Sequence, residues 1–95
     1  MVGLLTPAEI EAELHELNGW TYDGSALVKR FVFADFASAI DFMASVRPAI
    51  DELNHHPEWA NVYDRIDVRL NSHDVGGVTE RDLRLARLLD DFGDL

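Results

Sequence analysis

The sequence contains no cysteine, which excludes disulfide bonds and thiolate metal ligands. It also lacks long hydrophobic runs, since no apolar stretch approaches the roughly 20 residues that a membrane-spanning helix needs. The N-terminal residues show neither the basic start nor the long apolar middle of a signal peptide. We therefore expect a cytoplasmic protein that has no membrane partner.

Basic residues are scarce. Eight Lys and Arg against 18 Asp and Glu give a net charge of −10, which repels the phosphate backbone of nucleic acids, and no basic stripe offsets it. Nucleic acid is therefore not expected as a partner. The 95 residues, of which 47% are hydrophobic and 27% charged, predict one globular domain over residues 1–95.

Turn and capping signals organise the first third of the chain. Thr6-Pro7-Ala8-Glu9 has the form of a capping box with proline at the first helical position, and it predicts a helix that ends at Asn18-Gly19. Asp23-Gly24 lies between two extended runs and predicts a β-hairpin. Val28 and Val32 leave the outer face of the second strand partly apolar, so we expect another subunit to cover it.

A second helix is predicted to begin after Asp35, a typical N-cap residue. Pro48 should kink this helix about one turn before itself. The residue before Pro57 is disfavoured in helical geometry, so the helix should end at His55 or His56. Apolar residues recur near a period of 3.6 and are predicted to face the core: Phe36, Ile40, Met43, Ala44, Ile50 and Leu53.

The remaining pattern is extended, then helical. Residues 59–70 read as one strand, or as two strands separated by a turn at Tyr63-Asp64-Arg65. Thr79 and Asp82 form a shortened capping box that should begin the last helix. The predicted buried stripe of that helix is Leu85, Leu88, Leu89 and Phe92. The whole pattern predicts an α+β domain with helices on one face of an antiparallel sheet.

Three of the four histidines lie between residues 51 and 82. His55 and His56 are adjacent and precede Pro57, and His73 follows the alternating run. Two histidine positions at loop edges, separated by a strand-length segment, can converge in space. His15 stands alone in the first helix, and we interpret it as a solvated or packing residue because catalysis needs converging groups.

The residues alone leave three interpretations of His55 and His56. The imidazoles could cap the carbonyl groups at a helix C-terminus, they could bind a metal, or they could act as acid and base near neutral pH. Adjacent residues on a helix diverge by about 100°, which disfavours the metal. Asp82 can be explained as a helix cap, and Trp59 as a packing residue rather than a stacking platform.

One motif narrows these alternatives. It comprises Glu52-Leu53-Asn54-His55-His56-Pro57-Glu58-Trp59, Asn61-Val62-Tyr63, His73 and Thr79-Glu80-Arg81-Asp82. With it, the chain resembles the pterin-4a-carbinolamine dehydratase family. The resemblance implies an αββαββα fold in which three helices pack on one face of a four-stranded antiparallel sheet. It also implies a homodimer or homotetramer.

The resemblance further implies the dehydration of a 4a-hydroxytetrahydropterin to the quinonoid dihydropterin, a step in tetrahydrobiopterin recycling. The pterin N5 lone pair can expel the 4a hydroxyl if one group protonates the leaving oxygen and another removes the N5 proton. His55 and His73 are assigned to these two transfers, and His56 to binding and orientation. No metal or other cofactor is required.

Other site residues are also implied by the resemblance. Asn54, Pro57 and Asp82 are expected to bind substrate, and Asp82 to position one imidazole as well. Two residues depart from the family pattern, because Asp51 stands where a glutamate is usual and Pro48 is unexpected in its helix. Both changes affect local geometry and leave the three histidines in place.

The alternative is a non-catalytic dimerisation, assembly or transcriptional cofactor module, because the resembled family includes such members. An interaction module does not need three imidazoles, whereas a dehydratase does. The presence of all three favours the enzyme.

Overall fold

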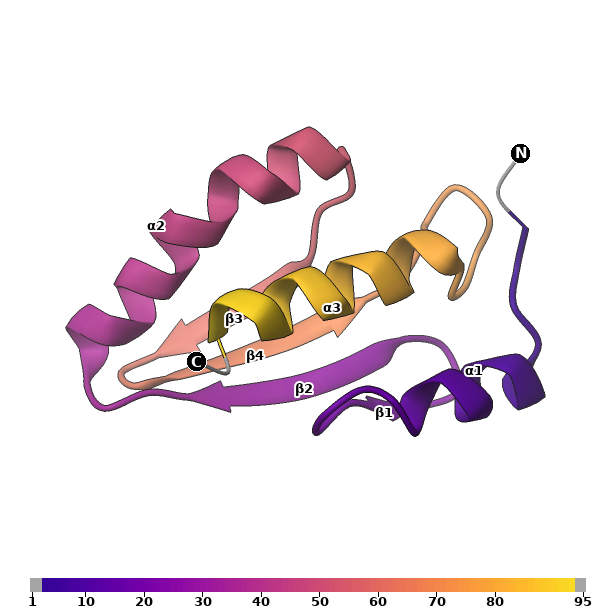
Figure 1. Cartoon of the computed structure of the whole chain (residues 1–95), viewed down its shortest axis with the longest axis horizontal. Helices are drawn as coiled ribbons and strands as arrows, with labels where there is room; N and C mark the ends of the chain where they lie inside the picture. Colours follow the sequence, from indigo (N-terminus) through magenta and orange to yellow (C-terminus); the bar gives the residue numbers. More distant parts are fainter. Residues whose placement is uncertain (1–2, 94–95) are drawn as a thin grey trace.

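The computed structural model describes residues 3–93, which form helices and strands in the order αββαββα (Figure 1). The elements are α1 (Pro7–Leu14), β1 (Thr21–Tyr22), β2 (Leu27–Val32), α2 (Phe36–Leu53), β3 (Glu58–Val62), β4 (Arg65–Leu70) and α3 (Glu80–Gly93). The strands form one antiparallel sheet in the order β1-β2-β4-β3. The predicted α+β fold is confirmed.

Two tight hairpins build this sheet. In the first, the Asp23 carboxylate accepts from the backbone N–H groups of Ser25 and Ala26 at 2.9 and 2.8 Å. In the second, Tyr63 takes a positive φ of 51° in a turn of two residues between β3 and β4. Residues 59–70 are therefore two strands, as the resemblance implied. β2 and β4 pair in the centre of the sheet, from Leu27 opposite Leu70 to Val32 opposite Arg65.

The helices and the inner face of the sheet share one hydrophobic cluster. In β4, Ile66, Val68 and Leu70 are buried in it, while the intervening charged residues point away. Phe42 of α2 packs its ring 5.3 Å from that of Phe31, between centroids. The Trp59 ring lies 6.5 Å from that of Phe42, between centroids, in an edge-to-face arrangement, which agrees with a packing role for this tryptophan.

The predicted inward face of α2 is partly wrong. Phe36 and Ile40 are 50% and 39% exposed, and Ala44 is also exposed. The buried positions are instead Ala39, Phe42, Val46 and Ile50. Both series advance by three or four residues, so periodicity permits either face. The aromatic contacts of Phe42 select the face that is buried.

The N-terminal caps occur as predicted. The Glu9 N–H donates to the Thr6 hydroxyl at 3.2 Å, and the Ser38 N–H donates to the Asp35 carboxylate at 2.8 Å. Helix α1 ends at Leu14, before the predicted Asn18-Gly19 stop. Helix α2 is continuous through Pro48, whose position on the exposed side lets its ring face solvent.

Two surface features bear on partners. Val32 on the outer sheet face is 66% exposed, as expected from the alternation of β2. In α3, Phe92 of the predicted buried stripe is 38% exposed, whereas Leu85 and Leu89 are fully buried. None of the helices in residues 3–93 combines the length and hydrophobicity that a membrane crossing requires.

Candidate active site

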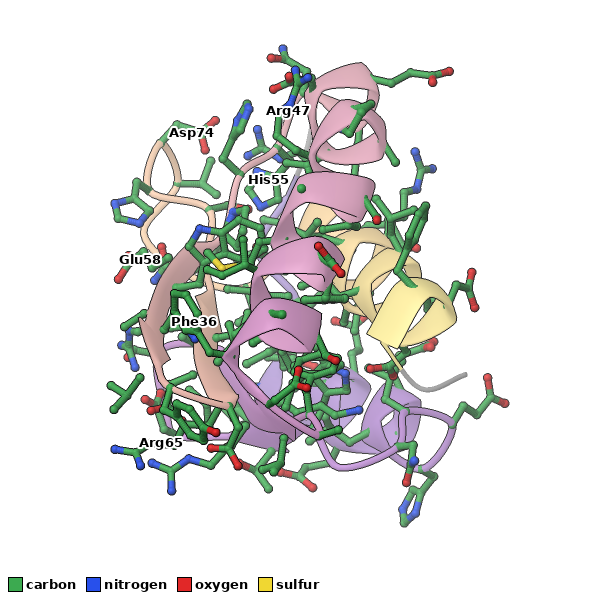
Figure 2. The ribbon with its side chains drawn as sticks, turned by 90° about the vertical axis from the view of Figure 1, so that its left-hand side faces the viewer. Phe36, Arg47, His55, Glu58, Arg65 and Asp74 are labelled. Atoms are coloured by element: carbon green, nitrogen blue, oxygen red, sulfur yellow. The ribbon has the colours of Figure 1, made fainter. Side chains whose placement is uncertain are left out.

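Three short segments meet at one end of the sheet: residues 54–57 after α2, the loop of residues 71–79 after β4, and the first turn of α3. Figure 2 shows His55 and Asp74, from the first two segments, close together at one end of the molecule, with Arg65 at the other. All three sequence-predicted site histidines belong to these segments.

Asn54 ends α2 and places both histidines outside the helix. It adopts the left-handed conformation, with φ 56° and ψ 38°, and its N–H lies 3.0 Å from the Ile50 carbonyl oxygen. Asparagine tolerates this conformation better than most residues. The helix therefore ends at Leu53, ahead of the predicted end at His55 or His56.

His55 and Asp82 form a direct and largely buried pair. His55 Nε2 lies 2.6 Å from Asp82 Oδ1, with the two side chains 11% and 0% exposed. Asp82 Oδ2 accepts from the Ser72 hydroxyl and from the Thr79 backbone N–H, both at 2.9 Å. A buried carboxylate is costly unless such donors surround it, and the N-terminus of α3 adds a favourable dipole.

This arrangement determines which imidazole nitrogen can exchange a proton. An ionised carboxylate only accepts hydrogen bonds, so His55 Nε2 carries a proton and donates it to Asp82. Nδ1 is then the nitrogen that gains or loses a proton.

The other two histidines form exposed pairs. His56 Nε2 lies 3.1 Å from Asp51 Oδ1, and His73 Nε2 lies 2.7 Å from Glu58 Oε1. The histidine side chains are 59% and 73% exposed. The hydrogen bond from His56 and then the one from Arg47 hold the pKa of Asp51 below its ordinary value.

The loop that carries His73 is fastened beside His55. Arg81 Nη2 donates to Asp74 Oδ1 at 2.7 Å and thereby ties the loop to α3. This bond is the main cause of a pKa of Asp74 below its ordinary value, and positive charge on His55 lowers it slightly further. His55 and the His73 loop are thus electrostatic neighbours.

The structure joins His55 directly to Asp82 and places His56 and His73 at the same end of the molecule with carboxylates of their own. Asn54 is exposed and Pro57 half-buried in the same turn. His15 is exposed on the C-cap of α1, which agrees with its predicted solvated role.

The capping interpretation of His55 and His56 is wrong, because both rings bind carboxylates, whereas the N–H that caps α2 is that of Asn54, which bonds the carbonyls of Ile50 and Asp51. The predicted cap role of Asp82 is present, since it accepts from the Thr79 N–H. Across residues 3–93, no group of three or more His, Cys, Asp or Glu side chains has an arrangement that could hold a metal ion.

Two residues of this site were not predicted from the sequence. Neither Glu58, which pairs with His73, nor Ser72, which contacts Asp82, was assigned a role. For Ser72 a signal existed: it continues the buried alternation of Val68 and Leu70 by one more step. A polar residue in that position requires a buried partner.

Two cavities lie away from this cluster. One of about 460 Å³ is on the sheet face opposite the helices and includes Thr21, Arg30 and Arg69 in its lining. Another of about 370 Å³ lies between α2 and α3, at Leu53 and Leu88. Neither is lined by a histidine. A third cavity, of about 280 Å³, includes Glu58, the partner of His73, in its lining.

Comparison with known proteins assigns the family. The family model described as "Pterin 4 alpha carbinolamine dehydratase" matches residues 3–92. The chain belongs to this family. A relative from Rhizobium johnstonii, named "Putative pterin-4-alpha-carbinolamine dehydratase", is 51% identical over 83 residues, covering 85% of this chain and 82% of the relative. A relative of the same name from Opitutus terrae is 50% identical over 88 residues, covering 92% and 91%.

A solved structure shows the same fold. The crystal structure of a protein from Brucella melitensis, described as a "transcriptional coactivator/pterin dehydratase", superposes with a TM-score of 0.90 at 41% sequence identity. The match covers 96% of this chain and 99% of the Brucella chain. The family resemblance stated from the sequence is thus confirmed over nearly the whole chain.

Proposed function

We propose that this protein is a hydro-lyase that dehydrates 4a-hydroxytetrahydropterin to the quinonoid dihydropterin and water. The observation that carries the proposal is His55, whose Nε2 is held by the buried Asp82 so that Nδ1 remains for proton exchange. Family membership supports the substrate class. We include a cytoplasmic location in the proposal, as expected from the sequence.

The reaction requires only proton transfers. The N5 lone pair forms the C4a=N5 bond, the C4a–O bond breaks, the departing oxygen takes a proton and N5 loses one. His55 and His73 serve as the acid and base pair for these two transfers. His56 orients the pterin, and Asn54 and Pro57 contribute contacts from the same turn.

The experiment is a stopped-flow measurement of 4a-hydroxytetrahydropterin decay with purified protein. We expect wild-type protein to accelerate the decay, and His55→Ala or His73→Ala to lower the rate by roughly 10- to 1,000-fold. His15→Ala is the matched control, because this exposed imidazole lies outside the site and should leave the rate unchanged. Wild-type protein no faster than buffer would contradict the proposal.

A second part of the proposal is assembly into a homodimer or homotetramer. Exposed apolar residues gather where β2 ends, α2 begins and β3 turns into β4: Val32, Phe36, Ile40, Val62 and Tyr63. Such residues on a charged protein are typical of a surface that another subunit covers. Light scattering at micromolar concentration should give at least twice the mass of the chain, and a monomeric mass would contradict this part.

The alternative of a non-catalytic interaction module has one supporting observation, the coactivator wording in the description of the Brucella protein. It predicts a normal assembly with no dehydration. The stopped-flow measurement therefore separates the two functions directly.

A further inference from the structure

Ser72 lies where the two halves of the proposed site meet. It is fully buried between the end of β4 and the first turn of α3. Its side chain belongs to the network around His55, and its main chain belongs to the loop that carries His73.

The donors and acceptors of the side-chain network can be assigned. Asp82 can only accept, so the Ser72 hydroxyl donates its single proton to Asp82 Oδ2 at 2.9 Å. The Thr79 hydroxyl, 2.8 Å from Ser72 Oγ, must then donate to Ser72. Thr79 Oγ1 in turn accepts from the Arg81 N–H at 3.2 Å. The chain of donors ends on the carboxylate that faces His55.

The main-chain bonds act on the loop. The Ser72 N–H donates to the Gly77 carbonyl at 2.8 Å, and the Ser72 carbonyl accepts from the N–H groups of Val75 and Gly76 at 3.1 and 2.9 Å. These bonds close the loop of residues 72–77 around Ser72. The residue that holds this loop, and with it the neighbouring His73, is therefore the same residue that contacts Asp82.

We infer that Ser72 is a positioning residue for the dehydration, because its hydroxyl fixes the carboxylate that orients His55 while its backbone anchors His73. Asp82 Oδ2 has two donors at fixed positions, and these set the plane in which Oδ1 meets the imidazole. Removal of the hydroxyl leaves the backbone bonds intact and leaves Asp82 Oδ2 with the Thr79 N–H as its one donor from this network, so the carboxylate is held less firmly. This inference rests on the proposed function.

The test is Ser72→Ala. We expect kcat to fall by roughly 10- to 100-fold, the range usual for partners that orient a functional side chain, with KM within about threefold. Ser72→Thr keeps the hydroxyl and should restore most of kcat. Thr79→Val removes only the more distant donor and should cost less than Ser72→Ala. Ser25→Ala makes the same chemical change at an exposed hydroxyl that contacts Asp23 and Arg69 instead of Asp82, and it should have no effect.

A second readout does not depend on turnover. The proton on His55 Nε2, at the short bond to Asp82, should give a protected downfield NMR signal in wild-type protein that shifts or broadens in Ser72→Ala. If wild-type protein lacks dehydratase activity, the proposed function fails while this signal still tests the positioning role. If Ser72→Ala does not fold, Ser72→Cys, a weaker donor, should give an intermediate loss.

Two results would overturn the inference. The first is a Ser72→Ala protein with kcat within about twofold of wild type and an unchanged imidazole signal. The second is a loss confined to KM, which would make Ser72 a binding residue rather than one that orients His55.

Discussion

The buried His55–Asp82 pair and the exposed His73–Glu58 pair have the same chemistry in different surroundings. Each joins a histidine Nε2 to a carboxylate oxygen, at 2.6 and 2.7 Å. Asp82 is fully buried and receives two further hydrogen bonds, whereas Glu58 is 53% exposed. The two hydrogen bonds are therefore similar in length, but the carboxylate of the first is held much more firmly than that of the second.

Surroundings decide how much each pair contributes. An exposed ion pair is screened by water and loses side-chain entropy on forming, so it contributes little. A buried carboxylate with a full set of donors cannot rotate without leaving polar groups unsatisfied. We therefore expect His55 to be held in one orientation and His73 to sample several until substrate binds.

The largest expected difference between the pairs is the loss of dehydration rate when each histidine is replaced. His55→Ala should lower the dehydration rate by roughly 100-fold or more, since an oriented acid or base is lost. His73→Ala should lower it by roughly tenfold, because water can reach this exposed position and replace the imidazole. Single-turnover rates check this order, and a larger loss for His73→Ala would reverse the comparison.

The carboxylates should show the same order with smaller effects. Asp82→Asn should lower kcat by roughly 10- to 100-fold, because the amide cannot accept from His55, Ser72 and Thr79 as the carboxylate does. Glu58→Gln should stay within about threefold of wild type. Steady-state kinetics on the two variants, with circular dichroism to verify folding, check the prediction. Equal losses would show that burial does not matter.

The smallest effect concerns the pH dependence of stability at the exposed His56–Asp51 pair. The folded pKa of Asp51 lies below its unfolded value, so its contribution to stability is complete above about pH 4 and is lost as the pH falls through the folded pKa. Asp51→Asn should therefore lose less stability than wild type between about pH 5 and pH 3. Urea unfolding across this pH range measures the stability of both proteins, and parallel curves of stability against pH would contradict the prediction.

Much of the fold followed from local signals. The caps at Thr6 and Asp35 and the hairpin at Asp23-Gly24 use contacts within three residues, which the sequence displays directly. The inward face of α2 could not be chosen in this way. Its buried face depends on where Phe42 meets Phe31 across the core, a contact between distant parts of the chain.

The candidate site divides similarly. The motif and its histidines were evident from the sequence, and so was the capping carboxylate of Asp82. Whether Asp82 reaches His55, 27 residues earlier, depends on how the end of α2 meets the start of α3. Ser72 was missed although its place in the buried alternation marked it, because the alternation was followed only as far as Leu70.

The central claim is that Asp82 acts through His55, and a double-mutant cycle tests it most directly. If Asp82 only orients His55, then Asp82→Asn has little left to remove once His55 is alanine. The double variant should therefore dehydrate the pterin within about threefold of the rate of His55→Ala alone. A double variant whose loss equals the product of the two single losses would contradict the claim.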